Sequence, residues 1–423
     1  MFTFLHVADI HLDSPLRGLA RYPGAPVDAV RSATRRALEN LVEYSLAQEV
    51  ALLVIAGDVY DGDWQDFQTG LHFTQQMRRL RDGGARVVLV RGNHDAENSM
   101  TKDLALPEGV VVLPADAPGT VVFDDLGVAV HGRSYAVRAV TENFVPGYPD
   151  PLPGLFNIGL LHTAVTGSEG HAPYAPCRVD EMLTKGYDYW ALGHVHEFRV
   201  LHEVPPVVYS GNIQGRNIRE TGPKGCVRVD VDDAGTVSLE RVFLDVMRWA
   251  VLDVDVSDAA DVHGVVEAFA GALTRALDEA EGLPLAVRVE LGGASAAHAA
   301  LIAGPESATS ELRARAEDLS GGRAWVEKVR VRTMPPVDLA ALTESDTPQG
   351  DLLRYIAQLA DESEVFDELG ADFSDLAAKL HSVPGTSVDL PDLKDEEVRR
   401  ALLDDVRALV LPLFGPGRGE GGS

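Results

Sequence analysis

Short apolar runs that stop at polar residues dominate the first half of the chain. Residues 51–57 are Ala-Leu-Leu-Val-Ile-Ala-Gly, a run too short for a helix, and they lead directly to Asp58. This pattern predicts a buried strand that delivers one carboxylate to a loop. Apolar residues at helical spacing over residues 27–47 and 64–81 predict helices, and the alternation of strand and helix through residue 95 indicates βαβ units.

Four further apolar runs also end at residues that can bind a metal. The runs are residues 2–8, 87–90, 158–161 and 189–192, and the residues at or just after their ends are Asp9 and His11, Asn93, His162, and His194 and His196. In open α/β sheets the ligand crevice lies outside the carboxyl ends of the strands. We therefore expect these side chains to converge on Asp58, although they are far apart in sequence.

The pattern changes after residue 110 to short strands separated by Gly and Pro turns, at residues 110–113, 120–123 and 128–131. Further strands are expected near residues 207–212 and 225–230. The predicted fold class is α/β (α+β): a core of two sheets packed as a β-sandwich and flanked by helices over residues 1–245. A smaller α+β module follows at residues 246–336, then a helical region at 337–414 and a disordered tail at 415–423.

The helical region is strongly acidic. Residues 338–413 hold 18 acidic and 6 basic residues, so we expect this part not to face a nucleic acid. Apolar residues recur at helical spacing over residues 352–359 and 398–406. Such stripes serve either packing within the chain or docking onto a partner, and the sequence leaves both alternatives open.

Composition and charge narrow the functional classes. The chain has 423 residues, a formal charge of −28 and two cysteines, Cys177 and Cys226, which are too few for a disulfide framework or a cysteine metal site. A protein that grips nucleic acid over a broad face is usually basic, so any polyanionic substrate must meet a local positive patch or bound metals. With no apolar run of about 18 residues, and with working structure expected from the second residue, we expect a cytoplasmic protein without a membrane span.

The candidate ligands combine carboxylates, an amide and imidazoles. On an extended chain, residues two apart point to the same side, so Asp9 can act with His11, and His194 with His196. Asp58 has two oxygens and can bridge two cations. Mixed oxygen and imidazole donors suit manganese, iron or zinc better than magnesium or calcium. Two such ions, about 3.5–4 Å apart, would serve phosphoester hydrolysis.

The ordered motifs resemble a known family. Asp9-x-His11, Gly57-Asp58-x-x-Asp61, Gly92-Asn93-His94-Asp95, His162 and Gly193-His194-x-His196 are similar, in order, to the five motifs of the calcineurin-like metallophosphoesterases. The resemblance covers roughly residues 1–230. Residues 11–16, 161–163 and 210–225 resemble the SbcD/YhaO branch in particular, the nuclease subunits of bacterial DNA repair exonucleases.

The resemblance implies a role for each matching residue. One metal would be held by Asp9, His11, Asp58 and His196, and the other by Asp58, Asn93, His162 and His194, with manganese favoured and iron or zinc as alternatives. His94 would assist departure of the sugar oxygen, and Asp61 would orient His94. Phosphoprotein phosphatases of the superfamily have an arginine directly after that aspartate, whereas this chain has Gly62, which argues against a phosphatase.

The implied function is a two-metal DNA phosphodiesterase, an exonuclease or endonuclease that works with an SMC-like ATPase (SbcC/YhaN-like). The ATPase would bind the C-terminal helices, the α+β module would select DNA ends, and the nuclease would form a homodimer. Arg216, Arg219 and Lys224 could receive DNA phosphates, or they could form surface ion pairs with Glu220 and its neighbours. The alternatives are hydrolysis of a small phosphodiester such as a cyclic nucleotide, and a non-catalytic scaffold for DNA ends.

Overall fold

The computed structural model describes residues 1–14, 32–61, 67–97, 106–165, 174–336, 339–359, 365–366, 369–370, 393 and 395–410. It divides into two compact units, Met1–Ala250 with Ala280–Ala286, and Val251–Glu279 with Val287–Ser423. In the described part of the chain, no helix is long and apolar enough to cross a membrane. The predicted tail at 415–423 lies outside the described residues.

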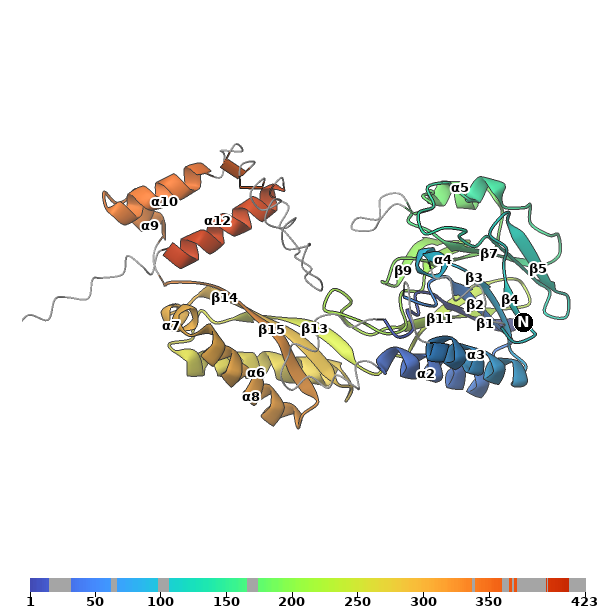
Figure 1. Ribbon diagram of the computed structural model, residues 1–423, viewed down its shortest axis with the longest axis horizontal. Helices are drawn as coiled ribbons and strands as arrows, with labels where there is room; N and C mark the ends of the chain where they lie inside the picture. The colour runs from blue at the N-terminus through green and yellow to red at the C-terminus, as the bar shows by residue number, and fades with distance from the viewer. Residues whose placement is uncertain are drawn as a thin grey trace, which may run out of the picture. The chain divides into compact units, whose positions relative to one another are not determined.

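The first unit contains two six-stranded sheets (Figure 1). One has the order β12 (Val237–Phe243), β11 (Gly225–Val231), β1 (Phe2–Val7), β2 (Leu52–Ala56), β3 (Arg86–Val90) and β4 (Val110–Val112). The other has the order β5 (Gly119–Phe123), β6 (Val128–Gly132), β7 (Phe156–His162), β8 (Tyr189–Gly193), β10 (Pro206–Tyr209) and β9 (Arg199–Glu203). Strands β1 to β4 run parallel, as do β6, β7, β8 and β10.

The main core lies between these sheets. Phe4, Val54 and Val88 of the first sheet share one buried cluster with Val130 and Leu160 of the second. The outer face of the first sheet is covered by α2 (Ala33–Ala47) and α3 (Phe67–Asp82), and that of the second by the segment containing α5 (Val179–Leu183) and a 3-10 turn (Val145–Gly147). Both faces of the central strands are therefore buried, which explains their continuous apolar runs. The predicted two-sheet α/β fold is confirmed.

Both predicted helices of this unit are present over the described residues. The helix expected at 27–47 begins at Ala33, and the one expected at 64–81 spans Phe67–Asp82. Residues 27–31 and 64–66 lie outside the described residues. Helix α4 (Asn93–Glu97) follows β3 directly, so Asn93 and His94 occupy its first positions.

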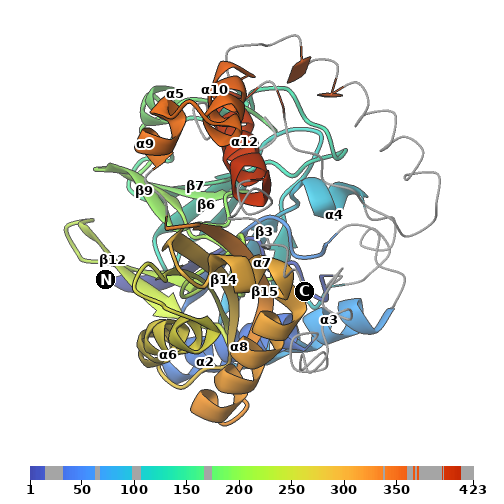
Figure 2. The same ribbon diagram turned by 90° about the vertical axis from the view of Figure 1, so that its left-hand side faces the viewer.

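The following module has a three-stranded sheet of β13 (Arg248–Asp255), β14 (Leu285–Ala294) and β15 (Ala324–Met334), with β14 in the centre. Figures 1 and 2 show α6 (Val262–Glu279) and α8 (Pro305–Ser320) on the same face of this sheet. The module is thus of the predicted α+β class. A short helix, α7 (His298–Ala303), precedes α8.

The C-terminal region is helical, with α9 (Leu339–Glu344), α10 (Pro348–Leu359) and α12 (Glu396–Val410). Ile356 of α10 and Leu403 of α12 lie in one buried cluster with Phe366 and Leu393. The two predicted apolar stripes therefore pack against each other. Tyr355 and Leu409 remain exposed.

Candidate metal centre

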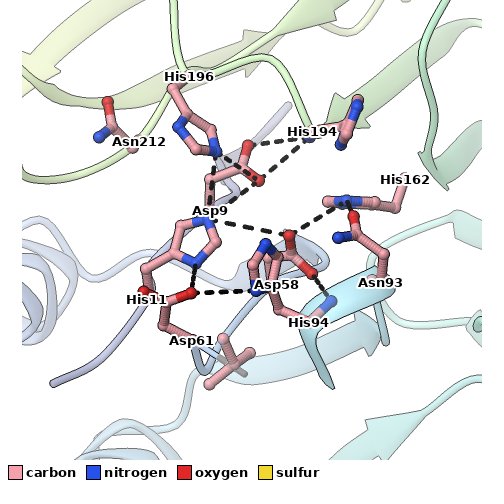
Figure 3. A network of polar contacts seen from close by, with 12 residues as sticks. Asp9, His11, Asp58, Asp61, Asn93, His94, His162, His194, His196 and Asn212 are labelled. Carbon is pink, nitrogen blue, oxygen red and sulfur yellow. Dashed lines mark hydrogen bonds and ion pairs between the residues drawn. The ribbon is translucent and has the colours of Figure 1, made fainter. Parts of the chain in front are cut away.

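The predicted strand ends meet at one edge of the sandwich (Figure 3). Asp9, Asp58 and Asn93 follow the parallel strands β1, β2 and β3 of one sheet, while His162 ends β7 and His194 follows β8 in the other. Backbone hydrogen bonds join the loops, from the Asp9 amide to Gly57 O and from the His11 amide to Asp58 O, each 3.0 Å long. Residues from both sheets thus face one small volume.

Asp9, His11 and His196 form a first group of donors whose ligand atoms lie within 4.8 Å of one another. Nε2 of His11 lies 3.2 Å from Nε2 of His196. Oδ1 of Asp9 lies 4.0 Å from the first nitrogen and 3.8 Å from the second. Two nitrogens held about 2.0–2.1 Å from one metal ion lie roughly 3–3.5 Å apart, so the group fits a shared cation.

Asp58 connects this group to a second one. Its Oδ2 atom lies 3.9 Å from Nε2 of His11 and 3.4 Å from Nε2 of His162, and Nε2 of His162 lies 2.9 Å from Oδ1 of Asn93. Oδ1 of Asp58 accepts a hydrogen bond of 2.9 Å from the His94 amide. Thus a single carboxylate oxygen faces the histidines of both groups, while the other oxygen fixes the orientation of the carboxylate.

The backbone at these positions differs from the extended chain that the sequence suggested. The φ angles of Asp9, His11, Asp58 and His194 are 52°, 45°, 53° and 101°. Such positive φ values cost residues other than glycine about 1–3 kcal/mol each and cluster at functional sites. Asp9 and His11 therefore face the same centre because the chain turns sharply at each of them, and the extended geometry is wrong for this pair and for His194.

Two glycines let the loops approach closely. A Cβ atom on Gly92 would lie 2.2 Å from Oδ1 of Asp58, and one on Gly57, whose φ is +92°, would lie 2.5 Å from Nδ1 of His162. Real Cβ atoms do not tolerate such contacts. The glycines of the Gly-Asp and Gly-Asn-His motifs thus make room for the ligands.

The outer nitrogens of three histidines face acceptors. Nδ1 of His162 donates to Ala56 O over 2.8 Å, Nδ1 of His196 lies 2.9 Å from Oε1 of Glu220, and Nδ1 of His11 lies 3.6 Å from Oδ1 of Asp61. A proton on Nδ1 leaves the Nε2 lone pair directed at the common centre, which is the arrangement of metal-ligating histidines. Glu220 was not predicted to contact a metal ligand.

Burial and neighbouring charges shift the pKa values of the side chains in the centre. Burial raises the pKa of Asp9. Burial also acts to raise the pKa of Asp58, but His162 and His11 outweigh it and hold the pKa of that carboxyl well below its usual range. Burial lowers the pKa of His11 to about 3, so this ring is neutral. Burial acts to lower the pKa of His162, but Asp58 outweighs it and raises that pKa to about 9. Two buried carboxylates that attract positive charge in this way fit divalent cations.

His94 and Asp61 lie beside the second group. Nδ1 of His94 is 3.0 Å from Oδ1 of Asp61. Burial acts to lower the pKa of His94, but the carboxylates of Asp61 and Asp58 outweigh it and raise the pKa. The geometry matches the predicted pairing, and the catalytic role stays a prediction.

His194 departs most from the predicted ligand set. The three donor groups found among the described residues do not include its ring. Its amide donates to Oδ2 of Asp9 over 3.0 Å, and its ring centroid lies 5.2 Å from that of His162. Its ligation stays a prediction.

The three basic candidates line a cleft of about 560 Å³ together with His196, Glu197, Asn217, Glu220 and Thr221. Arg216 is mostly buried and pairs with Glu220 at 2.7 Å, and Lys224 is buried and donates to His196 O. Arg219 is exposed. The ion pair with Glu220 that the sequence left as an alternative therefore exists, but inside the protein.

This fold and this donor set define a metal-dependent phosphoesterase, and the chain belongs to the calcineurin-like metallophosphoesterases. The sequence profile of the calcineurin-like phosphoesterase family matches residues 2–198, and that of the metallophosphoesterase YhaO middle domain matches residues 249–334. A relative named uncharacterized metallophosphoesterase YhaO, from Bacillus subtilis (strain 168), is 33% identical over 295 residues, which cover 69% of this chain and 72% of the relative.

The chain also has more distant similarities. The DNA double-strand break repair protein Mre11 of Methanopyrus kandleri is 26% identical over 212 residues, covering 45% of this chain and 44% of that protein. A solved dimetal phosphatase from Danio rerio aligns with a TM-score of 0.35 and 12% identity, over 57% of this chain and 96% of its own.

Proposed function

We propose that this metallophosphoesterase is a two-metal DNA phosphodiesterase, the nuclease subunit of an SbcCD-like repair complex. The observation that carries the proposal is the position of Oδ2 of Asp58, between Nε2 of His11 at 3.9 Å and Nε2 of His162 at 3.4 Å. Adjacent donor groups that share a carboxylate suit two cations holding one phosphodiester. The similarity to Mre11 repair proteins favours DNA as the polymer.

The residues that would hold the metals are Asp9, His11, Asp58 and His196 on one side, and Asp58, Asn93, His162 and His194 on the other. When bound, two divalent ions supply Lewis-acid polarisation of the phosphate and activation of water. Manganese is our preferred identity, because the donors mix oxygen and imidazole, with iron and zinc as alternatives.

His94 carries the acid step in this proposal. Its side chain is 29% exposed, and its Nδ1 faces Asp61 at 3.0 Å, which leaves Nε2 for the substrate. A raised pKa keeps the ring protonated closer to neutral pH. The imidazolium can then donate its Nε2 proton to the departing sugar oxygen.

Recognition of DNA and partners belongs to the same proposal. Arg219 is exposed at the cleft beside His196 and suits a backbone phosphate.

The acidic C-terminal helices would bind an SMC-like ATPase, the chain would form a homodimer, and the complex would work in the cytoplasm. The exposed Tyr355 and Leu409 are candidates for the ATPase contact; co-purification of the ATPase with the wild-type chain, and its loss in Tyr355→Ala and Leu409→Ala, tests that contact.

Manganese-dependent cleavage of end-labelled linear duplex DNA should be compared with hydrolysis of bis(p-nitrophenyl) phosphate, with and without the ATPase and ATP. We expect both substrates to be cleaved and DNA cleavage to rise with the ATPase. Rapid turnover of the small ester with DNA left intact would instead support a small-molecule phosphodiesterase. The scaffold alternative would be supported if a variant that no longer hydrolyses phosphodiesters kept both DNA binding and repair.

A further inference from the structure

A buried carboxylate lies directly behind His196. Oε1 of Glu220 is 2.9 Å from Nδ1 of His196, the ring nitrogen opposite the metal-facing Nε2. Glu220 also accepts hydrogen bonds from Asn212 Nδ2 at 2.9 Å, from the Arg216 amide at 2.8 Å and from Arg216 Nη2 at 2.7 Å. With only 7% of the residue exposed, these donors fix the carboxylate in one orientation.

Arg216 connects this carboxylate to the opposite side of the centre. Its Nη1 atom lies 3.5 Å from Oδ2 of Asp61, and Asp61 in turn faces Nδ1 of His94 at 3.0 Å and Nδ1 of His11 at 3.6 Å. One guanidinium therefore contacts both carboxylates that stand behind three histidines of the site. Only arginine has the planar set of donors that can span two carboxylates in this way.

The contacts also select the tautomer of His196. A carboxylate only accepts, so the 2.9 Å contact of Oε1 of Glu220 places a proton on Nδ1 of His196. Nη2 of Arg216 lies 3.1 Å from the same nitrogen, but it donates to Oε1 of Glu220, which is closer at 2.7 Å. Both groups thus donate to Glu220, and the Nε2 lone pair of His196 faces His11 and Asp9.

The loop that carries both residues is fixed by hydrogen bonds between side chains and backbone, which join residues 214–215 to residues 246–249. Gln214 donates to Met247 O and accepts from the Val246 amide, each over 2.9 Å. Nε1 of Trp249 donates to Gly215 O over 3.0 Å. Arg216 is thus held in its ion pairs and cannot turn toward a DNA backbone without breaking them.

We propose that Glu220 and Arg216 are positioning residues of the metal centre. Glu220 holds His196 in its ligating tautomer, and Arg216 ties Glu220 to Asp61 so that His196, His11 and His94 keep a fixed geometry. This replaces the role of a DNA phosphate contact that the sequence suggested for Arg216, and it rests on the proposed ligand role of His196.

The test is manganese binding, followed by calorimetry and by the Mn²⁺ electron paramagnetic resonance signal, together with kinetics on the chromogenic diester. In Glu220→Ala we expect the dissociation constant of manganese to rise about 10–100-fold. Glu220→Gln should restore part of the affinity, because its amide oxygen still accepts from Nδ1. In Arg216→Ala, kcat should fall with KM for the diester unchanged, and Arg216→Lys should rescue only part of it.

Arg178→Ala is the matched control, because Arg178 forms a surface pair with Asp180, with both side chains more than half exposed; it should behave as wild type. If Glu220→Ala fails to fold, the manganese affinity of Glu220→Gln decides whether Glu220 positions His196. Wild-type manganese affinity in folded Glu220→Gln and Glu220→Ala would overturn the inference while leaving the nuclease proposal intact. If weaker DNA binding were the sole defect of Arg216→Ala, Arg216 would be a DNA contact and not a positioning residue. A wild-type chain that binds no divalent ion would overturn both proposals.

Discussion

The charged side chains of the metal centre and those on the charged face of the β13-β14-β15 sheet have different kinds of partner. On the sheet, Arg288 pairs with Glu327 at 3.0 Å, and Glu290 pairs with Arg330 at 3.2 Å and with Arg332 at 3.0 Å. Arg330 and Arg332 share one face, as their spacing predicts, and each already has its counter-charge.

At the strand ends of the sandwich, the acidic groups face imidazoles instead. Asp9 and Asp58 are 1% exposed each, and the imidazole nitrogens of His11, His162 and His196 lie 3.4–4.0 Å from them. With a cation bound, these imidazole nitrogens would offer lone pairs rather than positive charge. Charges that are paired within a module need no ligand, whereas buried carboxylates that converge with histidine nitrogens indicate a bound cation.

Loss of the shared carboxylate should have the largest effect. Asp58→Asn keeps the shape of the side chain but removes the charge that both donor groups use, so we expect loss of at least one metal ion and a fall of turnover to background. Metal content by mass spectrometry and hydrolysis of the chromogenic diester measure both effects.

Glu290→Gln is the counterpart on the sheet. It removes two ion pairs of the kind that contribute about 0–1 kcal/mol each, so metal content and turnover should stay at wild-type values. Equal effects of the two substitutions would contradict the distinction between the two regions.

Replacement of His94 should separate catalysis from metal binding. His94→Asn removes the imidazole beside Asp61, and we expect kcat to fall roughly 10²–10⁴-fold with unchanged metal content. His202→Asn, at a histidine of β9 whose Nδ1 contacts Pro205 O, is the control and should keep full activity. If His94→Asn instead lost its metals, His94 would be part of the metal-binding structure rather than an acid.

Much of this centre could be predicted from the sequence, because the end of a buried strand can be recognised where an apolar run stops. The apolar run before Asp58 is continuous since both faces of β2 are buried, and its end marks where the carboxylate must lie. The same reasoning placed Asp9, Asn93 and His162 at one edge, where Figure 3 shows them facing one another.

The remaining features depend on contacts that no local pattern encodes. Glu220 lies 24 residues after His196, and nothing in its neighbourhood distinguishes it from a surface glutamate. Arg216 is bound to Asp61 across 155 residues. The left-handed backbone at Asp9 and His11 is also invisible in the sequence, because neither residue is a glycine.

A methyl group at Gly92 should disturb the centre without changing any ligand. In Gly92→Ala the new Cβ would meet Oδ1 of Asp58 at 2.2 Å, so the carboxylate or the loop must shift. A displacement of about 1 Å can lower the rate roughly 10²-fold, and we expect a loss of this size in turnover. Gly292→Ala in β14 meets no atom within 4 Å and should leave the kinetics unchanged, so a similar defect in both variants would contradict the proposed close approach.

The smallest expected effect concerns Arg219, an exposed residue that lines the cleft beside His196. Because one phosphate contact contributes about one unit to the slope of log affinity against log salt, Arg219→Ala should weaken DNA binding a few-fold at low salt and reduce this slope by about 1. Fluorescence anisotropy with labelled duplex over a series of salt concentrations measures both quantities. Turnover of the chromogenic diester should stay at the wild-type rate, since the small ester needs no contact outside the metals, and Arg178→Ala should change neither measurement. An unchanged salt slope in Arg219→Ala would place the DNA path away from this cleft, while a fall in diester turnover would show that Arg219 acts on the reacting phosphate itself.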